Sequence, residues 1–280
     1  MNKPVLYKMS GAGNDFVVLD GRGVDAVEFR QKKRITDLCA AYRTDGLMIL
    51  GKAPKAGPGE SRFDFRMEFF NPDGSGGMMC GNGGRCIVAF ADWIGVEPAS
   101  ADHYEFMAPD GPHRADILSR PESGLSGQWT VRLQMKDVDG IESILGGYFL
   151  NTGTRHFVKF VEDADAVNVE EEGKALRWNP AFAPEGANVN FVQVCEDSLK
   201  IRTFEKGVEG ETLACGTGIT AAAIAAFAAN STPGGEDTGR VRFRLQARRG
   251  DILTVEFTPS PDRTFKDIWL TGPAEFCRIQ

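Results

Sequence analysis

The hydrophobic positions of the chain fall mostly into short runs. These runs carry β-branched and aromatic residues and are bounded by Gly, Pro, Asp or Asn, a pattern typical of strands separated by turns. The sequence therefore predicts a chain dominated by β-strands. The expected strands are 4–10, 15–20, 46–50, 65–70, 129–135, 156–161, 189–194, 199–205, 241–247, 251–257 and 267–272.

Helical spacing of apolar residues is less frequent. It occurs over 26–42, and two further helices are expected directly after Cys80 and Cys215. The first of these two is apolar and ends at a glycine suited to the left-handed C′ position, and the second is rich in alanine. We expect Asn82 and Thr217 to cap their N-termini.

The two halves of the chain resemble each other. "GNDFVVLD" (13–20) parallels "TRHFVKFV" (154–161), and the segment around "MMCGNGGRC" parallels that around "LACGTGITA". Each half contains a strand, an excursion, a second strand, a Gly-rich turn with a cysteine, and a helix. This order predicts a duplicated unit, with the two copies facing each other across a pseudo-two-fold cleft.

The length of 280 residues favours about two domains, with a boundary expected among the turn-forming residues 120–128.

The formal net charge is -7, and no basic stretch is longer than the one at residues 31–34. Both features argue against nucleic acid or an anionic membrane as a partner. The N-terminus has no signal-peptide pattern and no long apolar run follows, so we expect a cytoplasmic protein that binds a small molecule. Surface loops are expected at 53–62 and 230–240.

The two cysteine motifs have a chemical use. Glycines leave the backbone N–H groups of each helix start open to a carboxylate, and the positive end of the helix favours thiolate over thiol. Inversion of a carbon centre by proton transfer needs a base on one face and an acid on the other, and Cys80 and Cys215 could take both roles in turn. Simple packing is the alternative for an isolated cysteine, and is expected for Cys39, Cys86, Cys195 and Cys277.

Two other uses of these cysteines are disfavoured. Neither motif has further ligands at zinc-binding spacing, so no metal is expected. A disulfide between Cys80 and Cys215 is not expected in a reducing compartment.

Four segments carry a resemblance to a known family. "SGAGNDFVVLD", "FFNPDGS" with "MMCGNGGRC", "GANVNFV" and "FEKGVEGETLACGTG" resemble the motifs of the diaminopimelate epimerase family, and the resemblance runs from about residue 5 to 277. It implies an isomerase without a cofactor that interconverts LL- and meso-diaminopimelate, in lysine and peptidoglycan precursor synthesis. It also implies an α/β (α+β) fold of two similar domains, each a mostly antiparallel sheet wrapped around a central helix. We expect domains 1–125 and 126–270, with strand 271–280 returning to the first, and a homodimer.

The resemblance also implies roles for individual residues. Cys80 and Cys215 match the two catalytic bases, and His156 and Glu205 match polar residues near the thiols that tune their protonation. The substrate carboxylate would lie on the backbone of both Gly-rich turns, and asparagines would hold the rest of the substrate. These expected binding residues are Gly81, Asn82, Gly216 and Thr217 for the carboxylate, and Asn14, Asn71 and Asn188 for the remainder.

Three features depart from the family pattern. Lys206 stands where the family usually has Arg, Thr154 and Arg155 precede His156 in place of the usual residues, and the turn before 46–50 is shorter. A lysine cannot grip a carboxylate with two parallel hydrogen bonds, so recognition of the distal end of the substrate by Thr154 and Lys206 could differ. The alternatives are therefore a related racemase or epimerase without pyridoxal phosphate, a non-catalytic amino-acid-binding protein, or a thiol redox sensor.

Overall fold

The computed structural model describes residues 4–55, 62–77, 79–98, 100–122, 127–230 and 239–277. The chain forms two compact units, Met1–Leu133 with Gly272–Gln280, and Gln134–Thr271. The domain boundary expected between residues 125 and 126 falls outside the described residues, as do most of the loops expected at 53–62 and 230–240.

The described residues of the first unit form eight strands. They are β1 (Leu6–Gly11), β2 (Asn14–Asp20), β3 (Gly46–Gly51), β4 (Phe65–Phe70), β5 (His103–Ala108), β6 (Gly111–Ser119), β7 (Gln128–Gln134) and the end of β16 (Phe265–Cys277). Neighbours in this order are hydrogen-bonded, and β16 pairs with β7 through Gly272–Glu275 and with β1 through Glu275–Cys277. The sheet of this unit is therefore closed on itself.

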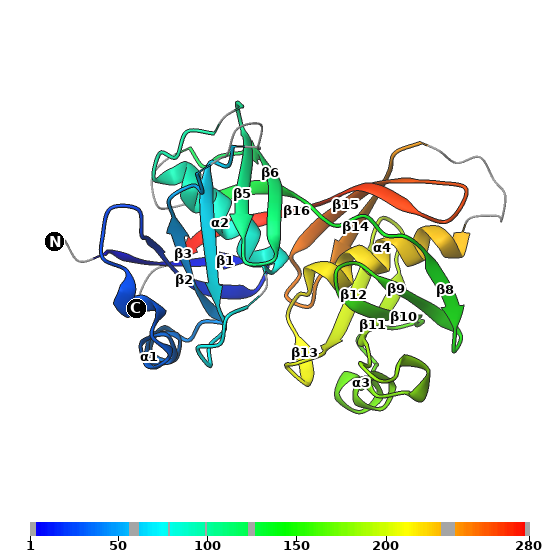
Figure 1. Cartoon of the computed structure of the whole chain (residues 1–280). Coiled ribbons are helices and arrows are strands. Elements are labelled where there is room, and N and C mark those ends of the chain that lie inside the picture. The colour runs from blue at the N-terminus through cyan, green and yellow to red at the C-terminus, as the bar shows by residue number, and fades with distance from the viewer. Residues whose placement is uncertain are drawn as a thin grey trace. The chain divides into compact units, whose positions relative to one another are not determined.

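Helix α2 (Gly81–Trp93) contacts β1, β2, β3 and β6. Every residue from Gly81 to Ala91 is buried, because strands surround the helix (Figure 1). The 3-10 helix η1 (Val27–Arg30) and α1 (Lys32–Tyr42) cover β2 and β3 from another side, with Phe29, Ile35 and Leu38 in their core. Burial of an apolar helix inside a sheet removes far more apolar surface from water than a helix on one face would.

The second unit repeats this plan. Its strands are β8 (Ile141–Ile144), β9 (Gly147–Asn151), β10 (Arg155–Phe160), β11 (Asn188–Val194), β12 (Leu199–Glu205), β13 (Gly210–Thr212), β14 (Val241–Gln246), β15 (Ile252–Pro259) and the start of β16. The order is β8-β9-β10-β11-β12-β14-β15-β16, and β13 pairs with β12. Helix α4 (Gly216–Asn230) contacts six of these strands and is buried along most of its length (Figure 1). Helix α3 (Val169–Arg177) and the 3-10 helix η2 (Pro180–Phe182) pack on β11 and β12 through Phe182 and Phe204.

The pairing pattern is the same in both units. The pairs β1–β2, β2–β3, β3–β4, β4–β5 and β5–β6 are antiparallel, parallel, antiparallel, parallel and antiparallel. The pairs β9–β10, β10–β11, β11–β12, β12–β14 and β14–β15 follow the same series. Two similar, mostly antiparallel sheets around central helices confirm the predicted fold class.

Several predicted details were wrong or incomplete. The helix expected over 26–42 is interrupted at Gln31, whose extended backbone separates η1 from α1. The strands β5, β6, β8 and β9 and the helix α3 lay in segments for which no element was predicted. Helix α3 has only 9 residues and three glutamates in its first turn, so too few apolar residues follow one another to reveal it.

Candidate functional site

Cys80 lies at the N-cap of α2. Its backbone is extended (φ -97°, ψ 145°), and its Sγ accepts a hydrogen bond of 3.2 Å from the N–H of Gly83. The expected cap, Asn82, is instead the second residue of the helix. A sulfur that accepts from the first helical turn is stabilised as thiolate, because the N–H dipoles there point at it.

Close packing at this cap favours glycine at position 83. A Cβ there would lie 3.2 Å from Cys80 Sγ and 3.2 Å from Met48 Sδ. A side chain at position 83 would therefore press on the sulfur of Cys80 unless its neighbours moved.

A chain of hydrogen bonds starts from the buried side chain of Arg85. Arg85 donates to Asn82 Oδ1 at 2.8 Å, Asn82 Nδ2 donates to Asn14 Oδ1 at 2.6 Å, and Asn14 Nδ2 donates to Asp45 Oδ2 at 3.2 Å. Arg85 also donates to Gly81 O and to Pro273 O of β16, both at 3.3 Å. The cation at one end and the carboxylate at the other fix the orientation of both amides.

Asn71 lies in the turn that leads from β4 toward Cys80. Its backbone N–H donates to Ser75 O at 2.9 Å, and its side-chain Nδ2 donates to Ser75 Oγ at 3.0 Å. Its hydrogen bonds therefore serve the turn, and none joins it to Asn14 or Asn82 in the described part of the chain. Its substrate-binding role stays a prediction.

Cys215 precedes α4 and is 8% exposed. Its carbonyl accepts from the N–H of Ile219 at 2.8 Å, which is the first bond of the helix, so Cys215 takes the N-cap position expected for Thr217. Thr217 instead lies within the first turn of α4, where its Oγ1 is 3.3 Å from Cys215 Sγ. Cys80 and Cys215 thus stand at equivalent positions of the two repeated units.

His156 is completely buried behind Thr217. Its Nε2 lies 3.0 Å from Thr217 Oγ1 and 2.9 Å from Thr154 Oγ1, and the two threonine hydroxyls are 3.1 Å apart. Burial lowers the pKa of His156 to about 3, although a hydrogen bond with Asn190 opposes the shift. The imidazole is therefore neutral at physiological pH, and its hydrogen-bonded path to Cys215 passes through the Thr217 hydroxyl.

A hydrogen bond links the side chain of Asn188 to the backbone of Lys206. The N–H of Lys206 donates to Asn188 Oδ1 at 2.7 Å, while Asn188 Nδ2 donates to Arg155 O at 3.0 Å. The Lys206 residue is exposed, and Glu205 beside it is the last residue of β12. The structure thus gathers Thr154, His156, Asn188 and Thr217 beside Cys215, with Lys206 bound to them through its backbone.

Sequence reasoning missed three residues of these networks, Asp45, Arg85 and Asn190. Arg85 is the charged residue in an otherwise apolar stretch of α2, and it is fully buried. Asn190 follows Asn188 by two positions on β11, and the alternation of a strand places both side chains on one face. Both signals could have been read from the sequence.

The other four thiols lie in buried or partly buried surroundings. Burial raises the pKa values of Cys39, Cys86 and Cys277, so each remains a thiol. Cys86 is fully buried, and a Cβ added to Gly11 would lie 2.9 Å from its sulfur. The packing expected for these three cysteines fits their surroundings.

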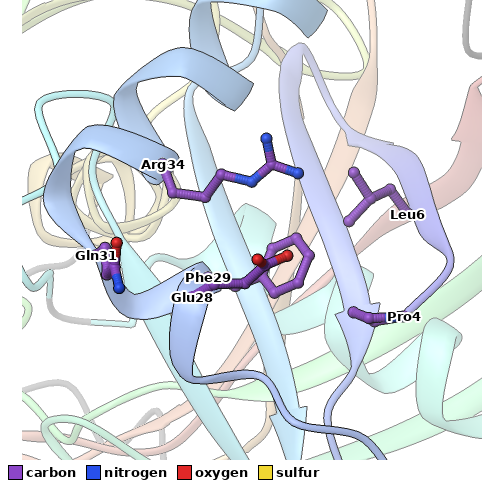
Figure 2. Close-up of a pocket in the computed structure, with 6 residues that line it drawn as sticks. All are labelled: Pro4, Leu6, Glu28, Phe29, Gln31 and Arg34. Carbon is purple, nitrogen blue, oxygen red and sulfur yellow. The ribbon is translucent and has the colours of Figure 1, made fainter. Parts of the chain in front are cut away.

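A separate hollow of about 350 Å³ lies in the first unit between η1, α1 and the chain entering β1. Figure 2 shows the Arg34 guanidinium and the Glu28 carboxylate lining it together with Pro4, Leu6, Phe29 and Gln31. None of the residues predicted for the site lines this hollow.

Within the described ranges, no group of three or more His, Cys, Asp or Glu side chains is arranged to hold a metal ion, and no helix is long and apolar enough to cross a membrane.

Known structures share this fold. A phenazine biosynthesis protein of the PhzF family from Bacillus anthracis matches with a TM-score of 0.69 at 14% identity, over 99% of this chain and 98% of that one. A probable proline racemase from Agrobacterium radiobacter K84 matches with a TM-score of 0.64 at 16% identity, over 99% and 93%. At these identities the likeness concerns the fold alone.

Sequence relatives define the family. The family model for diaminopimelate epimerase matches residues 6–109 and 148–258. Diaminopimelate epimerase from Chlorobaculum tepidum is 38% identical, over 95% of this chain and 96% of the relative, and that from Aquifex aeolicus is 38% identical, over 95% and 93%. The chain therefore belongs to the diaminopimelate epimerase family.

Proposed function

We propose that this protein interconverts LL- and meso-diaminopimelate by moving one proton at an α-carbon, without a cofactor. One observation carries the proposal: each repeated unit places a cysteine at the N-cap of its buried central helix, Cys80 in one and Cys215 in the other. Family membership supplies the substrate. A duplicated thiol at a helix start suits a reaction that must act on both faces of one carbon.

In the proposed reaction one sulfur is a thiolate and the other a thiol. The thiolate removes the α-proton from one face, and the thiol delivers its own proton to the opposite face of the carbanion. Each turnover thus inverts the carbon and exchanges the protonation states of Cys80 and Cys215. The reverse reaction starts from the state that the forward reaction leaves.

The helix starts would stabilise the charge that develops on the substrate. When the α-carbon loses its proton, negative charge moves onto the carboxylate, and N–H groups fixed in advance stabilise it without reorganisation. We assign the substrate carboxylate to the backbone of Gly81, Asn82, Gly216 and Thr217. Asn14, Asn71 and Asn188 are assigned to the polar groups of the substrate, because an amide can both donate and accept without adding charge.

Lys206 and Thr154 bear on the choice of substrate. The backbone N–H of Lys206 donates to Asn188 Oδ1, and the residue is exposed. We assign its side chain to the distal end of the substrate. A related amino-acid racemase or epimerase with another distal group is the competing function.

An assay with several substrates separates the two functions. Purified protein is supplied with LL-diaminopimelate, meso-diaminopimelate, L-proline or L-glutamate, and the stereoisomers are resolved by chiral chromatography. We expect turnover of the two diaminopimelates alone, and its loss in Cys80→Ala and in Cys215→Ala. Turnover of proline or glutamate with none of diaminopimelate would support the competing function, and full activity of either cysteine variant would refute the two-thiol reaction.

A homodimer and a cytoplasmic location are the remaining parts of the proposal, and both rest on sequence reasoning. Light scattering coupled to size-exclusion chromatography tests the first, with 30.5 kDa as the mass of one chain. A mass of one chain at assay concentration would refute the dimer.

A further inference from the structure

Asn190 contacts Nδ1 of His156, the ring nitrogen that does not face Thr217. Both side chains have no solvent exposure, and Asn190 Nδ2 lies 3.0 Å from His156 Nδ1. The same Nδ2 donates to the carbonyl of Phe157 at 3.1 Å, while Asn190 Oδ1 accepts from the hydroxyl of Thr203 at 3.0 Å. The amide therefore uses both of its N–H groups and its oxygen inside the second unit.

These bonds fix which way the Asn190 amide points. If the amide were turned over, its oxygen would face the carbonyl oxygen of Phe157, and two acceptors would meet without a hydrogen between them. The NH₂ group must therefore face both Phe157 O and His156 Nδ1. It follows that Nδ1 accepts a hydrogen bond and that the proton of the neutral imidazole lies on Nε2.

The position of this proton sets the direction of the bonds that lead to Cys215. An Nε2–H group donates to the threonine hydroxyls, and Thr154 also donates to Thr217 Oγ1. A hydroxyl that accepts from these neighbours has its own hydrogen available for Cys215 Sγ, 3.3 Å away. With the proton on Nδ1 instead, Nε2 would become an acceptor and would compete with the sulfur for that hydrogen.

We propose that Asn190 is a positioning residue, which holds His156 as the Nε2–H tautomer so that Thr217 donates its hydroxyl hydrogen to the Cys215 thiolate. This inference rests on the proposed function in one respect, because that function is what gives Cys215 a proton to transfer. The tautomer follows from the contacts of Asn190, and the hydroxyl direction follows from those of His156, Thr154 and Thr217. Asn188 Nδ2 lies 3.5 Å from His156 Nε2, but its shorter bond, of 3.0 Å, goes to Arg155 O. The expected consequence is a larger thiolate fraction at Cys215.

Gly218 supports this arrangement independently. A Cβ at position 218 would lie 2.5 Å from Asn190 Oδ1 and 3.3 Å from His156 Cε1. The first turn of α4 thus packs directly on Asn190 and His156. A side chain at 218 would displace the amide or the ring, and a glycine there keeps both in place.

The tautomer can be observed directly. The chain has three histidines, so long-range ¹H–¹⁵N spectra of the ¹⁵N-labelled protein at pH 7.5 are simple, and His156→Gln identifies the signals of His156. We expect the Nε2–H pattern in the wild type, and the same pattern in the control Thr203→Val, which keeps both donor bonds of Asn190. An Nδ1–H tautomer or an imidazolium in the wild type would overturn the proposal, and this measurement needs no variant of Asn190.

The effect on the thiol is measured by the pH dependence of iodoacetamide alkylation. Cys215 is followed in a Cys80→Ser background and Cys80 in a Cys215→Ser background. In Asn190→Asp the ionised carboxylate can only accept, so it should draw a proton to Nδ1, and the ¹H–¹⁵N spectrum of this variant distinguishes the neutral Nδ1–H ring from an imidazolium that also keeps Nε2–H. The apparent pKa of Cys215 should then rise by about one unit, the size expected for loss of one hydrogen bond to a charged group, while that of Cys80 stays unchanged.

The pathway through Thr217 is tested by a double-mutant cycle. Thr217→Val should raise the apparent pKa of Cys215 to a similar extent, and Asn190→Asp with Thr217→Val should add nothing further. Additive shifts, or an unchanged or lowered value in a folded Asn190→Asp whose His156 ring is neutral with its proton on Nδ1, would overturn the proposal. Because alkylation uses no substrate, failure here is distinct from absence of epimerase activity.

Discussion

Arg85 donates to the side-chain oxygen of Asn82 at 2.8 Å from a position without solvent exposure. This bond leaves Asn82 Nδ2 to donate to Asn14, so one buried cation orients two amides predicted to lie at the substrate. We expect Arg85→Met to lower the free energy of unfolding by about 2–4 kcal/mol, because it removes several hydrogen bonds from a buried charged group and leaves their acceptors unsatisfied.

Urea unfolding at pH 7.5 measures this change. Arg66→Met is the matched control, since Arg66 is exposed on β4 of the same unit and should change stability by less than about 0.5 kcal/mol. KM for diaminopimelate should also rise in Arg85→Met if Asn14 binds substrate. Equal stability of the two variants would contradict the role assigned to Arg85.

The low pKa of His156 predicts how stability depends on pH. The folded protein keeps this imidazole neutral down to about pH 3, whereas the unfolded chain protonates it near its usual value of 6.5. The unfolded state therefore binds more protons between these values, and stability is complete above pH 6.5 and falls as the pH is lowered. From pH 7.5 to pH 5 we expect His156 to account for a loss of about 2 kcal/mol.

Comparison of the wild type with His156→Gln isolates this contribution. Urea unfolding is measured for both proteins at pH 7.5 and pH 5, and the variant should lose about 2 kcal/mol less than the wild type. The variant can be less stable at both values without affecting the comparison. An identical loss in the two proteins would show that His156 is not buried in its neutral form.

Close packing at Gly218 predicts an unusual response to alanine. In an open helix, alanine would stabilise relative to glycine by about 1 kcal/mol. At position 218 the added Cβ would meet Asn190 Oδ1 at 2.5 Å, so we expect Gly218→Ala to destabilise the protein by about 1–3 kcal/mol. Gly140→Ala in the same unit is the control, because no atom lies within 4 Å of its new Cβ. A Gly218→Ala variant as stable as the wild type would contradict this packing.

Much of the fold was readable from the sequence. The duplicated order of strands, Gly-rich turn, cysteine and helix appears as matching sheet pairings in both units, because each apolar helix after a cysteine can bury itself only inside a surrounding sheet. Strands β5 and β6 were missed, since their polar residues alternate with short apolar stretches that form no marked run. Gly95 was expected at the C′ position of the first central helix, and its φ of +72° confirms this.

The networks behind the cysteines could be predicted only in part. Sequence reasoning marked Cys80, Cys215, His156 and Asn188, but it took Asn82 and Thr217 as caps because their side chains are good acceptors. The cap positions belong to the cysteines themselves, and Asn82 and Thr217 are engaged with Arg85 and His156 instead. The partner of Asn82 is local, three residues along α2, whereas the partner of Thr217 is far away in the sequence and depends on strand register, which a local pattern does not specify.

The central claim is that two thiols act on opposite faces of one α-carbon, and proton exchange in D₂O tests it most directly. LL-diaminopimelate is incubated with the wild-type protein in D₂O, and the substrate and product are separated and analysed by mass spectrometry within the first few per cent of conversion. Two bases predict one deuterium at the inverted carbon of meso-diaminopimelate and none in the remaining LL substrate, because the removed proton stays on the first sulfur. Deuterium entering the LL substrate as fast as the product, or product that retains the original proton, would contradict the account.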